Sequence, residues 1–136
     1  MPEEVVMGIV GSSPGEGDAA QPMIDWINAA PPAELAPELM AAFGPDAPRR
    51  VPWLAVGDLS DWMFRRYPKQ TGFVVQARPV RESIYEAVQL LEHSELVYIR
   101  WTSDNECSWS ATRFGLTTLA NGKAAVRQRI KDRTGF

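Results

Sequence analysis

The stretch from Ile84 to Gly122 limits the fold of this chain more than any other part of the sequence. Its first part places apolar residues at the i, i+3, i+4 and i+7 positions, which predicts a helix with one buried face. These positions hold Ile84, Ala87, Val88 and Leu91. A run of alternating apolar and polar residues follows, then a polar turn, a second alternating run and another helical pattern. The sequence therefore predicts the order helix, strand, turn, strand, helix.

The alternation also predicts how the two strands pair. The apolar residues of both strands share a face only if the connecting loop has an odd number of residues, because a slip of one residue turns a whole strand over. The shortest such loop is Asp104 to Glu106, which places Trp101 directly opposite Trp109. This register puts the tryptophan pair on one face of the hairpin and Arg100 on the other.

This arrangement resembles the second half of a winged helix-turn-helix domain. In that family a long helix ending in a pattern like LLEHSELV runs into a β-hairpin wing. The helix after the wing opens with Thr, with Gly three and Leu seven residues later, as Thr112, Gly115 and Leu119 do here. Asn121 and Gly122 are expected to end this helix. The resemblance implies a mainly α fold with a small antiparallel β-hairpin (α+β), with a winged-helix core over residues 58–122.

The rest of the chain is expected to extend this core. Residues 1–21 are rich in Gly, Ser and acid, which predicts a flexible arm. Residues 22–57 are predicted to form a helical N-terminal extension, and residues 123–136 a C-terminal helix with Val126 and Ile130 inward. Because 136 residues suit one ordinary core, we expect a single domain over residues 22–136.

Individual residues near the start of the core carry further expectations. A proline-rich connection spans 45–57, and Asp58 after it is a plausible N-cap for the next helix. Trp26 and Trp62 fall at apolar helical positions and are expected to anchor the core. Trp53 is expected to pack into a loop.

The residue inventory argues against an enzyme. His93 and Cys107 are the only residues of their kinds, so one chain cannot supply a cysteine–histidine zinc site or a disulfide. We predict no catalytic residues, metal or cofactor. The acidic N-terminus and the lack of a long apolar run predict neither export nor a membrane span, and hence a cytoplasmic protein.

The family resemblance implies double-stranded DNA as the partner, with the helix before the wing in the major groove. On that helix the residues that would read bases are Arg81, Tyr85 and Gln89. The residues that would hold phosphates are Arg65, Arg66, Lys69 and Arg78, with Arg100 on the wing as a further candidate. The chain would then be a transcriptional regulator or accessory DNA-binding factor.

The distribution of charge favours a second interpretation. The net charge is −3, with −6 over residues 1–50, −1 over 51–99 and +4 over 100–136. The predicted wing tip is acidic, at Asp104 and Glu106, and would repel phosphate. The alternative function is therefore a protein-interaction adaptor on the same scaffold, a bacterial or phage accessory protein that does not bind DNA. The last helix could also form a homodimer interface.

The position of the cations separates the two interpretations. If Arg78, Arg81, Arg100 and the bases of the last helix fall on one face, DNA binding is favoured. If that face is neutral or acidic and apolar residues are exposed elsewhere, the adaptor is favoured.

Overall fold

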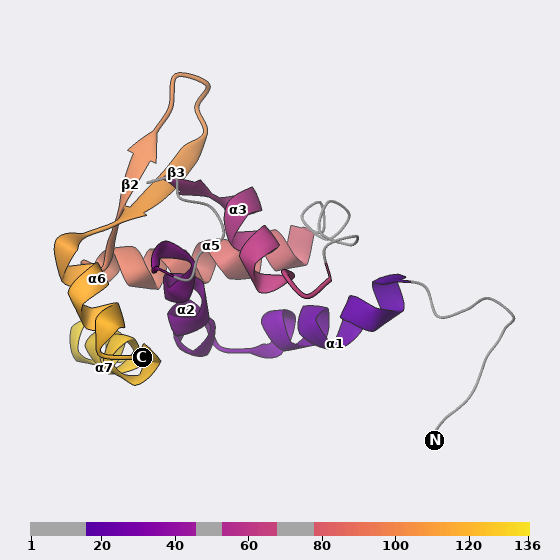
Figure 1. Ribbon diagram of the computed structural model, residues 1–136, viewed down its shortest axis with the longest axis horizontal. Helices are drawn as coiled ribbons and strands as arrows, with labels where there is room; N and C mark the ends of the chain where they lie inside the picture. The colour runs from indigo at the N-terminus through magenta and orange to yellow at the C-terminus, as the bar shows by residue number, and fades with distance from the viewer. Residues whose placement is uncertain (1–15, 46–52, 68–77) are drawn as a thin grey trace, which may run out of the picture.

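The computed structural model describes residues 16–45, 53–67 and 78–136 of the chain (Figure 1). The described chain is mainly helical, with one small three-stranded antiparallel sheet, so it is an α+β fold. Its elements are α1 (Glu16–Ala29), α2 (Pro32–Met40), the 3-10 helix η1 (Ala41–Phe43), β1 (Leu54–Ala55), α3 (Val56–Met63), α5 (Arg78–His93), β2 (Val97–Trp101), β3 (Cys107–Ala111), α6 (Arg113–Ala120) and α7 (Lys123–Thr134).

Helix α5 lies at the centre of the domain, in contact with α1, α2, α3 and α7 (Figure 1). The four residues that carry its predicted apolar face, Ile84, Ala87, Val88 and Leu91, are all buried. That face meets α2, which also contacts α7. The helical periodicity therefore predicted the central helix and its buried side.

The sheet has the strand order β1-β3-β2. Trp109 in the central strand pairs with Leu54 on one side and with Ile99 on the other. It also meets Tyr85 of α5 edge to face, with ring centroids 5.8 Å apart, so this face of the hairpin lies over α5. Strand β1 falls in the segment predicted as a proline-rich connection, because two residues are too few to show alternation.

The predicted register of the hairpin is wrong by two residues. Trp101 pairs with Cys107 rather than with Trp109. At the tip, the Asn105 amide donates to the Thr102 carbonyl at 3.1 Å, so the three-residue loop is 103–105 rather than 104–106. The last residue of such a loop adopts the left-handed conformation, which Asn tolerates better than Glu does, and Asn105 has φ 61°.

Helix α6 begins and ends as predicted. Thr112 is its N-cap, and its hydroxyl oxygen accepts a hydrogen bond of 2.8 Å from the Gly115 amide. The same hydroxyl donates to the Glu95 carbonyl at 2.7 Å, which ties the start of α6 to the turn before β2. Asn121 is the C-cap. The absence of a side chain at Gly115 allows α6 to approach the Leu96 carbonyl closely, because a Cβ there would lie 2.0 Å from that oxygen.

The N-terminal boundary and one tryptophan depart from expectation. Helix α1 begins at Glu16, inside the predicted flexible arm of residues 1–21, and it includes Pro22 as an internal residue. Trp26 on this helix is 42% exposed, so it is not a core anchor. Trp62 is buried, and its indole N–H donates to the Glu38 carbonyl at 3.0 Å, so it is the anchor that was predicted.

The predicted N-cap of α3 is also displaced. Ala55 occupies the N-cap position, and Asp58 lies three residues into the helix. The Asp58 carboxylate accepts a hydrogen bond of 2.9 Å from the Ala55 amide. Because β1 runs directly into α3, the carboxylate fixes this junction from inside the first turn rather than from before it.

A candidate binding cleft between the hairpin and helix α5

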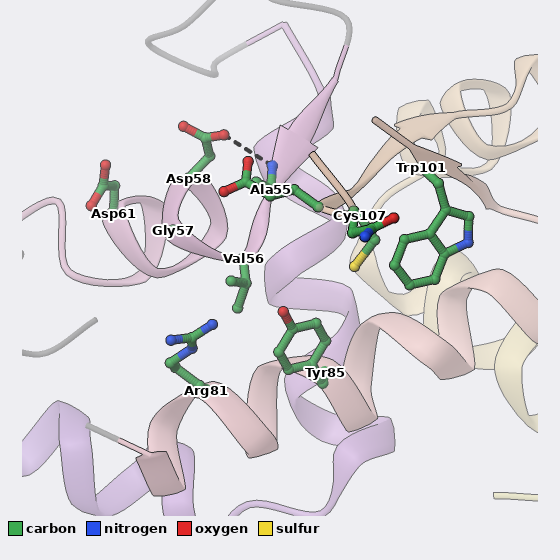
Figure 2. A pocket seen from close by; sticks show the side chains of 11 residues that line it. Ala55, Val56, Gly57, Asp58, Asp61, Arg81, Tyr85, Trp101 and Cys107 are labelled. Carbon is green, nitrogen blue, oxygen red and sulfur yellow. Dashed lines mark hydrogen bonds between the residues drawn. The ribbon is translucent and has the colours of Figure 1, made fainter. Parts of the chain in front are cut away.

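A cleft of about 760 Å³ lies between the start of α3, the first half of α5 and the outer half of the hairpin (Figure 2). Its volume is in the range of clefts that bind drug-sized molecules or short peptide segments. The residues that line it are Ala55, Val56, Gly57, Asp58, Asp61, Arg81, Tyr85, Trp101, Asn105, Glu106 and Cys107.

Two aromatic side chains line this cleft, one from the helix and one from the hairpin. Tyr85 rises from α5, and its ring is held by the edge contact with Trp109. Trp101 stands beside Cys107 near the tip of the hairpin and is 64% exposed (Figure 2). The register explains this exposure, because Trp101 is the last paired residue of β2 and lies opposite Cys107 rather than against Trp109.

The charged residues of the cleft are mostly acidic. Asp58 and Asp61 come from α3, and Glu106 comes from the hairpin tip. Arg81 is the one cation among the described lining residues, so the formal charge of the lining is −2. Asp58 also bonds the Ala55 amide, which holds it at the junction with β1. Among the described residues, no group of three His, Cys, Asp or Glu is placed to hold a metal ion.

The structure brings only some of the predicted base-reading and wing residues together. Arg81 and Tyr85 both line the cleft, and Gln89, one turn beyond Tyr85 on α5, is exposed. Arg100 lies on the opposite face of the hairpin from Trp101, since successive strand residues point to opposite faces. There its guanidinium carbon stands 5.0 Å from the centroid of the Trp53 ring.

The predicted phosphate-binding residues are placed less completely. Arg65 and Arg66 are exposed just after α3. The Arg65 guanidinium stacks on the Trp62 ring at 4.0 Å and donates to the Trp62 carbonyl at 2.8 Å, so this side chain is held against its own helix. Lys69 and the Arg78 side chain lie outside the described residues.

Three cations of α7 form ion pairs within the domain. Lys123 pairs with Glu38 at 2.8 Å, and Arg127 pairs with Glu34 at 2.7 Å, both on α2. Arg129 pairs with Glu95 at 2.7 Å, before β2. As predicted, Val126 and Ile130 face inward and are fully buried. This helix therefore packs on its own domain, and the cations in these three pairs do not join Arg81 on a common basic face.

Sequence reasoning missed most of this cleft. It selected Arg81 and Tyr85 from the helix pattern, but it gave no site role to Asp61 or Trp101, and it treated Glu106 only as a charge that repels phosphate. The sequence did show an acidic hairpin tip next to Cys107, and this was the available signal for a site on the hairpin. The sequence did not show that α3 lies near this tip, because the pairing of β1 with β3, which joins the start of α3 to the hairpin, was not predicted.

Comparison of the chain with family models, curated proteins and solved structures finds no match. In the described part of the chain, no helix has the length and apolar character needed to cross a membrane.

Proposed function

We propose that this chain is a protein-binding module on a winged-helix scaffold, and that the cleft between α3, α5 and the hairpin receives its partner. The observation that carries the proposal is the composition of this cleft, whose described lining joins the aromatic side chains of Tyr85 and Trp101 to the acidic hairpin tip at Glu106 and holds one cation, Arg81. Duplex DNA carries a dense row of negative charge, so a face of this kind opposes its approach. A protein segment with basic groups would be attracted to it.

Three local features support the winged-helix scaffold. The long helix α5 runs through a short turn into the β2–β3 hairpin, as in the family pattern. The helix after the hairpin is capped by Thr112, with Gly115 in close contact with the Leu96 carbonyl. The hairpin packs over α5 through Trp109 and Tyr85.

DNA binding is the second candidate, and one arrangement favours it. Arg81, Tyr85 and Gln89 follow one another at four-residue steps on the helix that precedes the hairpin, so they lie along one side of that helix. Arg and Gln are suited to guanine and adenine edges in the major groove. If DNA bound there, Arg81 would attract the DNA phosphates and Glu106 would repel them.

Two single substitutions distinguish the candidates because the expected signs are opposite. Arg81→Ala removes the cation of the cleft, and Glu106→Gln removes a carboxylate without changing the side-chain length. Protein binding predicts that Glu106→Gln weakens partner binding and that Arg81→Ala does not. DNA binding predicts that Arg81→Ala weakens duplex binding by about 1–3 kcal/mol, whereas Glu106→Gln strengthens it.

The experiment has two arms on purified protein. In the first, a random-peptide library is selected on the wild-type chain and counter-selected on Trp101→Ala, and the enriched peptides are then measured against both charge variants. In the second, anisotropy of a fluorescent random-sequence duplex is followed across a salt series. Peptides that depend on Trp101 and respond to Glu106→Gln support the proposal. Steeply salt-dependent duplex binding that Arg81→Ala weakens, with no Trp101-dependent peptide, would replace it with DNA binding.

A further inference from the structure

Strand β2 forms an outer edge of the sheet, since the strand order is β1-β3-β2 (Figure 1). The hydrogen bonds at the two ends of the hairpin show which residues on the β2 side bond to the β3 side. The Thr102 amide donates to the Glu106 carbonyl at 2.8 Å, and the Leu96 carbonyl accepts from the Thr112 amide at 3.0 Å. The pairing between these two ends is continuous, so the even-numbered residues of β2 bond to β3.

The odd-numbered residues of β2 therefore direct their backbone N–H and C=O groups away from β3, toward the outer edge. No described strand lies on that side, and no hydrogen bond between described residues uses the backbone of Ile99 or Trp101. Val97 is only 2% exposed, so the accessible part of the edge begins at Ile99 and continues to the hairpin tip. Ile99 and Trp101 each offer one backbone donor and one acceptor to a guest.

Strand β2 lacks several features by which proteins protect an exposed edge from pairing. It contains no proline or lysine, and its five residues pair with β3 without a bulge. Its one charge, Arg100, lies on the face of the hairpin away from Trp101, and not among the side chains directed toward α5. An edge of this kind is a template for another strand.

Side chains on both faces of β2 are exposed next to this edge. Trp101 is 64% exposed at the cleft, and Tyr98 is 48% exposed on the opposite face, beside Arg100. Arg100 contacts the Trp53 ring at 5.0 Å, and it forms no ion pair with a carboxylate of the described residues. Opposite charges at facing positions of neighbouring strands are stabilising, so an acidic guest residue suits the position opposite Arg100.

We infer that a segment of the partner protein binds in extended form along the edge of β2, as an additional strand of the sheet. Its residues opposite Ile99, Arg100 and Trp101 follow the pattern apolar, acidic, apolar, because a guest strand alternates between the same two faces. The backbone groups of the edge select an extended polypeptide, and the alternating side chains select its sequence. This inference rests on the proposed function, and it names the way in which the partner segment is held beside the cleft.

The probe for this inference is the library peptide of highest affinity among those that depend on Trp101. Each of its residues is replaced in turn by the N-methyl residue, which removes one backbone donor. Strand pairing predicts an alternating result, because every second amide of the guest points toward β2 and the others point away from it. N-methylation at a pairing position should weaken binding by about tenfold or more, and at the positions between by less than about threefold.

Amide hydrogen exchange locates the guest on the chain. In the free protein, the Ile99 and Trp101 amides should exchange rapidly, whereas the Tyr98 and Arg100 amides, which bond to β3, should exchange slowly. Peptide at about ten times its dissociation constant should slow exchange at Ile99 and Trp101 by about tenfold.

Matched arginine variants test the face opposite the cleft. Arg100→Gln should weaken binding of the peptide by about threefold, since an exposed charge pair is lost. Arg113→Gln is the control, because Arg113 is also an exposed arginine but lies on α6. It should leave the dissociation constant unchanged. Both variants replace exposed side chains, so the fold should persist.

The inference is overturned if N-methylation has the same effect at all guest positions, or if saturating peptide leaves exchange at Ile99 and Trp101 unchanged. Slow exchange at these two amides in the free chain that becomes rapid on dilution would also overturn it, because the occupant of the edge would then be a second copy. Peptides that depend on Trp101 without alternation would retain the protein-binding module and reject strand pairing. An absence of Trp101-dependent peptides would reject the module itself, and strand pairing of its partner with it.

Discussion

Replacement of Gly115 by alanine tests how closely α6 must approach the turn before β2. A Cβ at this position would lie 2.0 Å from the Leu96 carbonyl oxygen and 3.0 Å from the terminal methyl of Met40. The methionine can move, but the carbonyl belongs to the backbone. An ordinary carbon–oxygen contact is about 3.3 Å, so α6 would have to retreat by roughly 1 Å.

The expected cost follows from two opposing effects. Overpacking against backbone belongs at the upper end of the usual range, about 3 kcal/mol. Alanine favours a helix over glycine by about 1 kcal/mol, which offsets part of this cost. We therefore expect the free energy of unfolding to fall by about 2 kcal/mol. The retreat would also stretch the 2.8 Å bond from the Gly115 amide to the Thr112 hydroxyl, which acts in the same direction.

Urea unfolding followed by circular dichroism measures this loss. With a denaturant slope of about 2 kcal/mol per molar, the midpoint should fall by about 1 M. Thr117→Ala, an exposed position on the same helix, is the control and should change stability by no more than about 0.5 kcal/mol. A Gly115→Ala midpoint equal to or above that of the wild type would refute the reasoning, because helix propensity alone would then account for the result.

Two further predictions concern the contacts that hold α6 and α7 in place. Thr112→Val keeps the side-chain shape but removes both the cap of α6 and the hydrogen bond to the Glu95 carbonyl. It should lower the free energy of unfolding in urea by about 1–2 kcal/mol, whereas Thr112→Ser should retain most of the stability. The Arg129 side chain donates to the Ser94 carbonyl, pairs with Glu95 and stacks 4.6 Å from the Phe114 centroid, so Arg129→Ala should cost about 1–2 kcal/mol in thermal or urea unfolding. Glu95→Gln should cost less than about 0.5 kcal/mol, since the Glu95 side chain is largely exposed. A larger loss from this variant than from Arg129→Ala would contradict that order.

Elements whose pattern repeats over several turns were predictable from sequence. The apolar positions of α5 recur through two turns, and all of them are buried in the structure. The limits of α6 were also predictable, because Thr112 before the helix and Asn121 after it are strong local end signals. Strand β1 was not predictable, since Leu54 and Ala55 alone show no period.

The apolar pattern alone was not enough to predict the register of the hairpin. Alternation fixed which residues share a face, but a shift of two residues preserves that face, so alternation alone cannot choose between the two registers. The conformational preference of Asn105 decides the choice in the structure. The shift leaves Trp101 beside the hairpin tip, opposite Cys107, so its position at the cleft follows from the register.

The arrangement of charge shows why a basic stretch of sequence is weak evidence for a nucleic-acid surface. The first fifty residues carry a net charge of −6 and the last thirty-seven carry +4, which suggests an exposed basic end. In the fold, Glu34 and Glu38 from the acidic end meet Arg127 and Lys123 from the basic end. These cations join α7 to α2, and their field is compensated at close range. The charge of a surface therefore has to be inferred from the fold rather than from the sequence segment.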